Sequence, residues 1–170
     1  MKRLAEAAAG DLVWTRTARF SRAWELRSGD EVVASLTWPS TFSSRAVAVA
    51  DGARWEFLRE GTFRARVVLR DGAGGPEPAR FERRFGGGGE IVFPDGRRLL
   101  WSRGGLIRST WSFTTSDGFP VVTFSSELRW FRSIERLQID ETARSLSELP
   151  LLALVGWYLV ILTRRNRAAR

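Results

Sequence analysis

The chain has 170 residues, a net charge of +8, and neither histidine nor cysteine. The missing imidazole and thiol exclude Ser-His and Cys-His nucleophilic catalysis, disulfides and nearly all zinc, copper and non-haem iron sites. The length suits one domain, residues 1–170, whose positive charge is almost entirely arginine because Lys2 is the only lysine. Such a surface attracts anions, or simply keeps a protein in solution.

The N-terminal residues begin like a secretory signal peptide but do not continue as one. Glu6 interrupts the apolar stretch, and Gly10-Asp11 ends it before an apolar region of sufficient length forms. We therefore expect a cytoplasmic protein, with peripheral attachment to a membrane as the alternative.

Residues 12–139 carry a repeated turn signal. The dipeptide Asp-Gly, which suits the positive φ angles of a tight type I′ hairpin turn, recurs at separations of 20, 24 and 22 residues. This spacing leaves room for two strands and two turns per step, as in an antiparallel meander. The copies are Asp51-Gly52, Asp71-Gly72, Asp95-Gly96 and Asp117-Gly118, with Ser28-Gly29-Asp30 as a looser fifth.

Between these turns, apolar and polar residues alternate with a period of two. One dry face and one wet face are typical of an antiparallel sheet covered on a single side. The glycine run 86–89 lacks the following lysine and helix start of a phosphate-binding loop, so we interpret it as a turn. We predict twelve strands, at 12–20, 23–28, 31–38, 45–50, 53–59, 62–70, 79–85, 90–93, 97–102, 106–115, 119–125 and 133–139.

Five arginines share the wet phase of two neighbouring predicted strands. Like-phase residues on adjacent antiparallel strands lie side by side, so these side chains predict a basic patch that could bind phosphate groups. The alternative is that they only solubilise the outside of the protein. They are Arg64, Arg66, Arg70, Arg80 and Arg84.

The C-terminal segment predicts a hydrophobic helix over about 148–163, followed by a basic tail at 164–170. Residues 149–163 carry no charge, Ser147 is a suitable N-cap, and Pro150 is tolerated in a first helical turn. A helix that is apolar on every side is buried or lies in a membrane. Within it, Gly156 predicts a close approach to a bulky neighbour.

Two lengths favour burial of this helix. About fifteen helical residues rise roughly 22 Å, which is short of the roughly 30 Å hydrocarbon core of a bilayer. A closed barrel of about twelve strands leaves an interior that side chains alone do not fill, and a helix about 10–12 Å across suits it. We therefore predict a mainly β fold, an antiparallel barrel around a central helix. The alternative is a tail-anchored membrane protein with a cytoplasmic β domain.

The order of several short motifs resembles the tubby-like superfamily, closest to its LURP-one-related branch. The resemblance runs from about Trp14 to Arg165 and implies a twelve-stranded barrel threaded by a hydrophobic C-terminal helix. Relatives include tubby domains, which bind phosphoinositide headgroups, and phospholipid scramblases, but no site residue of theirs can be carried over. The motifs are Trp24-Glu25-Leu26-Arg27 with Glu31-Val32-Val33-Ala34, Phe93-Pro94-Asp95-Gly96, Phe119-Pro120-Val121-Val122-Thr123-Phe124, and Leu149-Pro150-Leu151-Leu152-Ala153-Leu154.

Carboxylates are the main catalytic candidates left. Glu135 with Asp140 and Glu141, or Glu56 with Glu60, could form acid-base pairs, although each also suits a charge that balances nearby arginines. We expect no enzyme, no cofactor and no metal site.

The favoured function is a binding or scaffold protein. Its expected partner is an anionic membrane lipid, another phosphate-bearing ligand or an unidentified protein. Nucleic-acid binding, with Trp130 and Phe131 as stacking platforms beside the arginines, is the less favoured alternative.

Overall fold

The structure is a computed structural model that describes residues 3–19, 21–61, 65–84, 87–105 and 109–169. It contains a short N-terminal helix α1 (Leu4–Ala7), twelve strands, a 3₁₀ helix η1 (Glu141–Ser145) and a long helix α2 (Leu149–Ala168). The strands are β1 (Leu12–Arg16), β2 (Ala23–Ser28), β3 (Glu31–Thr37), β4 (Ala46–Ala50), β5 (Ala53–Glu60), β6 (Arg66–Asp71), β7 (Arg80–Arg83), β8 (Gly89–Val92), β9 (Arg98–Gly104), β10 (Ser109–Thr114), β11 (Pro120–Arg129) and β12 (Arg132–Ile139).

The strands form a closed antiparallel barrel, which confirms the predicted fold. Each strand pairs with the next along the chain, and β1 pairs with β12 to close the ring. The twelve predicted strands are all present, with most ends within a few residues. The strand ends differ by up to four residues: β1 ends at Arg16, short of its predicted end at residue 20, and β11 continues to Arg129, beyond its predicted end at residue 125.

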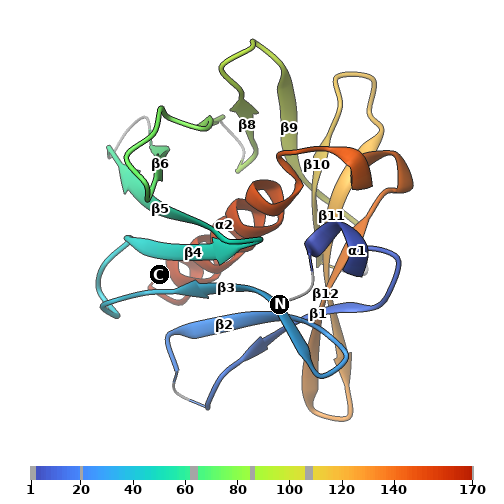
Figure 1. Cartoon of the computed structure of the whole chain (residues 1–170). Coiled ribbons are helices and arrows are strands. Elements are labelled where there is room, and N and C mark those ends of the chain that lie inside the picture. The colour runs from blue at the N-terminus through green and yellow to red at the C-terminus, as the bar shows by residue number, and fades with distance from the viewer. Residues whose placement is uncertain (1–2, 20, 62–64, 85–86, 106–108, 170) are drawn as a thin grey trace.

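Helix α2 lies inside this barrel (Figure 1). Every residue from Leu151 to Ile161 is buried, on all sides of the helix. Within the described ranges, no helix is both long and apolar enough to cross a membrane. Helix α2 continues five residues past its predicted end at about residue 163, so residues 164–168 of the predicted basic tail are helical. Arginine is a good helix former and is favourable near the negative end of the helix dipole, so the predicted tail forms the last turns instead.

The start of α2 also differs from the prediction. Glu148, not Ser147, occupies the N-cap position, and the Ser147 hydroxyl donates to the Glu148 carboxylate instead of capping the helix. That carboxylate forms an ion pair with Arg97 in the β8–β9 turn. Pro150 lies in the first turn, where its missing N–H removes no hydrogen bond.

Aromatic side chains pack the barrel wall against the helix. Trp157 of α2 stacks on Trp14 of β1 with ring centroids 5.3 Å apart and planes 6° apart, and Tyr158 stacks on Trp38 at 5.9 Å. Gly156 confirms the expected close approach, since a Cβ there would lie 2.3 Å from the Phe124 ring. The inside of the barrel is therefore filled with side chains.

Helix α1 is a feature that we did not predict from the sequence. Leu4 is fully buried, and its backbone N–H donates to the carboxylate of Asp51 at 2.9 Å. The segment thus covers part of the barrel end at which α2 begins, where the β4–β5 turn also lies. It is too short and too weakly patterned for sequence periodicity to reveal.

Candidate functional site

The predicted arginine face of β6 and β7 is interleaved with carboxylates. Arg66 pairs with Glu60 at 2.9 Å, and Glu82 lies opposite Arg66 on β7. Arg70 lies opposite Glu56 on β5. The face therefore alternates in sign instead of concentrating positive charge.

The remaining members of that face are also tied to acidic residues or lie outside the described ranges. Arg80 contacts Glu77 at 3.5 Å, and Arg84 contacts the buried carboxylate of Glu90 at 2.8 Å. Arg64 lies outside the described residues. The alternation of residues along each strand identified arginines that share a face of the sheet. It did not reveal the carboxylates that the neighbouring strand and loops bring to the same face.

Positive charge is instead concentrated at one of the two ends of the barrel. Because consecutive strands run in opposite directions, every turn that follows an even-numbered strand lies at the end of the barrel where α2 begins. All seven aspartates of the chain lie at this same end. We call this the acidic end, and the opposite end, where α2 finishes, the basic end. The described arginines at the basic end are Arg16, Arg19, Arg22, Arg45, Arg59, Arg66, Arg83, Arg84, Arg103, Arg129, Arg132, Arg164, Arg165 and Arg167.

An open cavity of about 650 Å³ lies at the basic end, between the last turns of α2 and the strand ends of the barrel wall. Four of its lining residues are arginines from four different elements, and no described lining residue is acidic. We call it the arginine cavity. Its arginines are Arg59 of β5, Arg83 of β7, Arg103 of β9 and Arg167 of α2.

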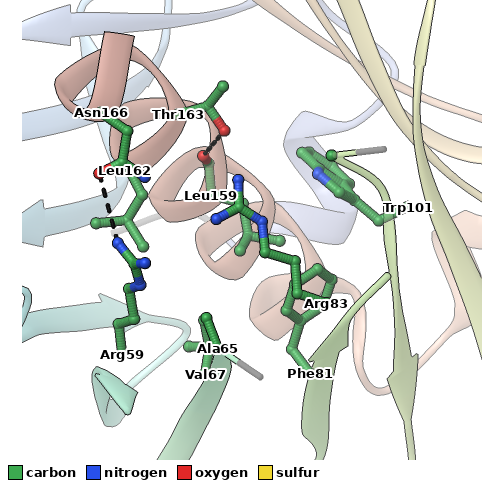
Figure 2. Close-up of a pocket in the computed structure, with 11 residues that line it drawn as sticks. Arg59, Ala65, Val67, Phe81, Arg83, Trp101, Leu159, Leu162, Thr163 and Asn166 are labelled. Atoms are coloured by element: carbon green, nitrogen blue, oxygen red, sulfur yellow. Dashed lines mark hydrogen bonds between the residues drawn. The ribbon is translucent and has the colours of Figure 1, made fainter. Parts of the chain in front are cut away.

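The arginines of the cavity differ in how they are held. Arg59 is half-buried and donates to the side-chain oxygen of Asn166 at 3.4 Å, which ties it to α2. Figure 2 shows Arg59 and Arg83 extending from the wall toward the last turns of the helix. Arg103 and Arg167 are exposed, and neither forms an ion pair with any described residue. These two guanidinium groups therefore have donors available for a ligand.

A smaller apolar recess of about 30 Å³ continues inward from the arginine cavity. Its walls include Val67, Phe81, Trp101, Leu159 and Leu162 (Figure 2). A space of this size holds about two waters. A ligand would therefore occupy the wide outer cavity, with at most a small group in the recess.

The glycine turn between β7 and β8 forms another wall of the arginine cavity. Gly87 has a φ of +93°, and a Cβ on Gly88 would lie 2.8 Å from the backbone oxygen of Trp101. Glycine is needed here so that two backbone segments can approach closely. The turn lacks the helix of a phosphate-binding loop, as we predicted, but it still borders the site.

The helix arginines beside the cavity are anchored to the barrel. Arg164 makes two hydrogen bonds to the buried Glu135 carboxylate, at 3.0 and 2.8 Å. Arg165 lies over the Trp38 ring at 4.6 Å, and burial lowers its pKa. These contacts fix the last turns of α2 and so hold Arg167 and Asn166 in place.

The first predicted set of catalytic carboxylates is spread along the barrel. Glu135 is buried on β12 against Arg164, whereas Asp140 follows the last residue of that strand at the acidic end. Asp140 accepts a hydrogen bond from the backbone N–H of Thr142 and caps η1, whose first residue is Glu141. Five residues of strand separate Glu135 from Asp140 by roughly 16 Å, too far for them to act on one bond.

The second set consists of surface ion pairs. Glu56 pairs with Arg45 at 2.7 Å, and that hydrogen bond lowers the pKa of the carboxyl. Glu60 pairs with Arg66. Both carboxylates balance neighbouring arginines, which was the alternative interpretation of these residues.

Of the cavity arginines, Arg167 lies in the predicted basic tail, but Arg59, Arg83 and Arg103 were missed by sequence reasoning, which grouped arginines along a strand and not across strand ends. A signal was present, because arginines recur at the ends of odd-numbered strands. Comparison of the chain with protein-family models, curated proteins and solved structures found no match.

Proposed function

We propose that this protein is a non-enzymatic binding module for a phosphate-bearing anion, in particular the headgroup of an anionic phospholipid, and that the arginine cavity binds it. The observation that carries the proposal is the lining of this cavity, which contains four arginines and no acidic residue among those described; of the four, the exposed Arg103 and Arg167 form no ion pair with a described residue. Like charges gathered around one space repel one another, and a bound anion would relieve that repulsion.

Arginine suits phosphate for geometric reasons. Its planar guanidinium presents several donors in a fixed fork that matches two phosphate oxygens. The exposed Arg103 and Arg167 supply such donors, while Ser102 and Thr163 place hydroxyl groups in the same lining. A cavity of about 650 Å³ has the size of ordinary small-molecule sites.

A soluble probe separates this site from the arginine face of β6 and β7. We expect inorganic pyrophosphate to bind the protein in isothermal titration calorimetry, and Arg103→Glu with Arg167→Glu to weaken binding by roughly tenfold or more. The matched control is Arg70→Glu with Arg80→Glu, which changes the net charge equally but alters the other face. Equal loss in both variants would mean that only net charge matters, and loss in the control alone would move the site to that face.

Vesicle binding tests the lipid part of the proposal. The protein should sediment with phosphatidylcholine vesicles that contain phosphatidylserine and not with phosphatidylcholine alone. Binding should weaken as salt rises from low to physiological concentration, because exposed charges more than about 8 Å apart are then screened. Equal binding to neutral vesicles, or no binding to pyrophosphate or to anionic vesicles, would refute the proposal.

A further inference from the structure

The hairpin of β11 and β12 projects beyond the rest of the barrel. Among the described residues, β10 pairs with β11 as far as Ser126, and β1 pairs with β12 from Glu135 onward. The described pairs beyond these residues join β11 and β12 to each other, through three more residue pairs that end with Arg129 and Arg132. Three residues of strand span about 10 Å. The hairpin therefore extends from the basic end as a two-stranded ribbon, at the bottom of Figure 1.

The turn at the tip of this hairpin has an unusual sequence. Its two residues are Trp130 and Phe131, with φ angles of +46° and +67°. Bulky residues rarely adopt this left-handed region, and two-residue hairpin turns that need it favour Asn-Gly or Asp-Gly. The β4–β5 turn of this chain uses Asp51-Gly52 for the same purpose, with φ angles of +50° and +78°. Folding alone does not explain aromatic residues at the tip.

The tip exposes large apolar side chains to solvent. Trp130 is 93% exposed, Phe131 is 100% exposed, and Leu128 on the adjoining strand is 78% exposed. Contiguous apolar surface of this kind usually marks an interaction site. Immediately behind the tip, Arg129 and Arg132 lie directly opposite each other. Arg129 pairs with Glu127 at 3.0 Å, whereas Arg132 is exposed and forms no ion pair with a described residue, so its guanidinium has donors available for an anionic partner.

We infer that this tip inserts into the headgroup region of an anionic lipid bilayer. Tryptophan and phenylalanine would enter the boundary between headgroups and acyl chains, which tryptophan in particular favours. Arginine side chains lay their aliphatic part along apolar surface while the guanidinium contacts the lipid phosphates. We call the inserting residues, Leu128, Trp130 and Phe131, the hairpin tip.

The position of the hairpin tip within the fold supports a membrane over other partners. It lies at the basic end, as does the fully exposed Phe42 of the β3–β4 loop, while every aspartate lies at the opposite end. Insertion would therefore turn the arginine cavity toward the bilayer and the acidic end away from it. A convex tip that includes the aliphatic Leu128 is a poor platform for stacked bases, which require a groove with aromatic faces.

This inference extends the proposed function, because it makes a bilayer the source of the phosphate that the arginine cavity binds. The decisive variant is Trp130→Asn with Phe131→Gly, which installs the favoured sequence for such a turn. We expect its binding to vesicles of phosphatidylcholine and phosphatidylserine to fall at least tenfold, while its melting temperature equals or exceeds that of the parent. A role of the aromatics in folding would lower the melting temperature instead.

The matched control is Phe119→Ser. Phe119 is 69% exposed but lies in the β10–β11 turn at the acidic end, so its removal should leave vesicle binding unchanged. Equal loss in the control and in the hairpin variant would mean that general apolar exposure causes binding, and would overturn the inference. So would unchanged binding in the hairpin variant.

Insertion itself can be measured by labelling. The chain has no cysteine, so Phe131→Cys gives a unique thiol at the tip and Ser116→Cys gives one at the acidic end. A nitroxide on residue 131 should become protected from water-soluble relaxation agents when anionic vesicles are added, whereas one on residue 116 should stay accessible. Equal accessibility at both sites in the vesicle-bound protein would overturn insertion.

Pyrophosphate separates the two hypotheses. If both hold, the hairpin variant binds pyrophosphate like the parent and loses only vesicles. If the arginine cavity does not bind phosphate but the tip inserts, vesicle binding depends on Trp130 and Phe131 and not on Arg103 and Arg167. Self-association or binding to a single-stranded oligonucleotide that depends on the tip, without vesicle binding, would overturn the membrane inference in favour of those partners.

Discussion

Gly156 gives the sharpest test of how the helix fits its barrel, through the substitution Gly156→Ala. In an exposed helix this change would stabilise the protein by about 1 kcal/mol, because alanine has the higher helix propensity. Here a Cβ would lie 2.3 Å from two carbons of the Phe124 ring. Ordinary van der Waals contact requires 3.4–4 Å, so the ring or the helix has to move by more than 1 Å.

The surroundings of Phe124 decide whether that movement is possible. The ring is 2% exposed and lies edge-on to Trp101 at 5.7 Å and near Trp157 at 6.4 Å. Protein interiors have few voids, so displacing one ring displaces its neighbours. Overpacking a core typically costs about 1–3 kcal/mol, and this contact belongs in the upper part of that range. Set against the gain in propensity, the net loss for Gly156→Ala is about 1–2 kcal/mol.

Thermal unfolding followed by circular dichroism measures the effect. A loss of this size should lower the melting temperature by roughly 2–8 °C in a domain of this length. The double variant Gly156→Ala with Phe124→Leu should lose less than the sum of the two single changes, because the shorter side chain leaves room for the methyl group. If Gly156→Ala melts at or above the parent temperature, the helix does not contact the wall as the structure has it, and the reasoning fails.

Three further predictions concern the same core and its ion pairs. Deletion of 146–170 should give an insoluble or non-cooperatively unfolding protein, because it removes several aliphatic side chains that each contribute about 1.5–3 kcal/mol on burial; a soluble truncation with a sharp thermal transition would contradict this. Arg164→Gln should lower the free energy of unfolding by about 1–3 kcal/mol in urea denaturation, because the buried Glu135 carboxylate loses two hydrogen bonds, and Glu135→Gln in the same chain should recover part of the loss. Burial raises the pKa of Glu148, but its hydrogen bonds, led by that from Arg97, outweigh this and hold the pKa below the ordinary 4.5. The stability that ionised Glu148 contributes to the folded protein is therefore complete above pH 4.5 and falls as the pH drops below that value. Arg97→Ala should flatten the plot of melting temperature against pH in this range.

The sequence was sufficient for the barrel because local signals agreed with one another. Asp-Gly turns marked where strands end, and alternation of apolar and polar residues marked which face was buried, so turn chemistry and pattern gave the same strand list. The helix followed from composition alone, since 149–163 carries no charge and is apolar on every side. Its true end at Ala168 could not be predicted, because the contacts that order the final turns are Arg164 with Glu135 and Arg165 with Trp38, from distant parts of the chain.

The candidate site could be predicted less well because charge balance is a property of neighbours in space. Arg66 and Arg70 share the phase that we predicted, but Glu60 and Glu56 on β5 share it too. An anion site requires arginines without nearby carboxylates. The alternation of residues along one strand does not show which carboxylates a neighbouring strand places beside them. For the tip of the β11–β12 hairpin, Trp130 and Phe131 were named only as stacking platforms in the nucleic-acid alternative, and the hairpin that carries them was not predicted, because the prediction ended β11 at residue 125, before the exposed Leu128.

The antiparallel meander explains how a charge pattern along the chain becomes a difference between two ends. Odd-numbered strands all run toward the basic end, and β1, β7 and β11 finish in arginine, while β5 and β9 have arginine one residue earlier. Even-numbered strands run toward the acidic end, and each finishes in an aspartate or leads directly into a turn that contains one.

The two ends then serve different needs. At the acidic end, aspartate has a local task, since it shapes the Asp-Gly turns and, through Asp140 and Asp51, caps η1 and holds the start of α1. At the basic end the turns do not need arginine, and Trp130-Phe131 even opposes the preferred turn conformation. Residues that a fold does not require, gathered around one cavity and one projecting tip, are best explained by what they bind. This reasoning would fail if neutral replacements of Arg103, Arg167 and Trp130 left every binding measurement unchanged.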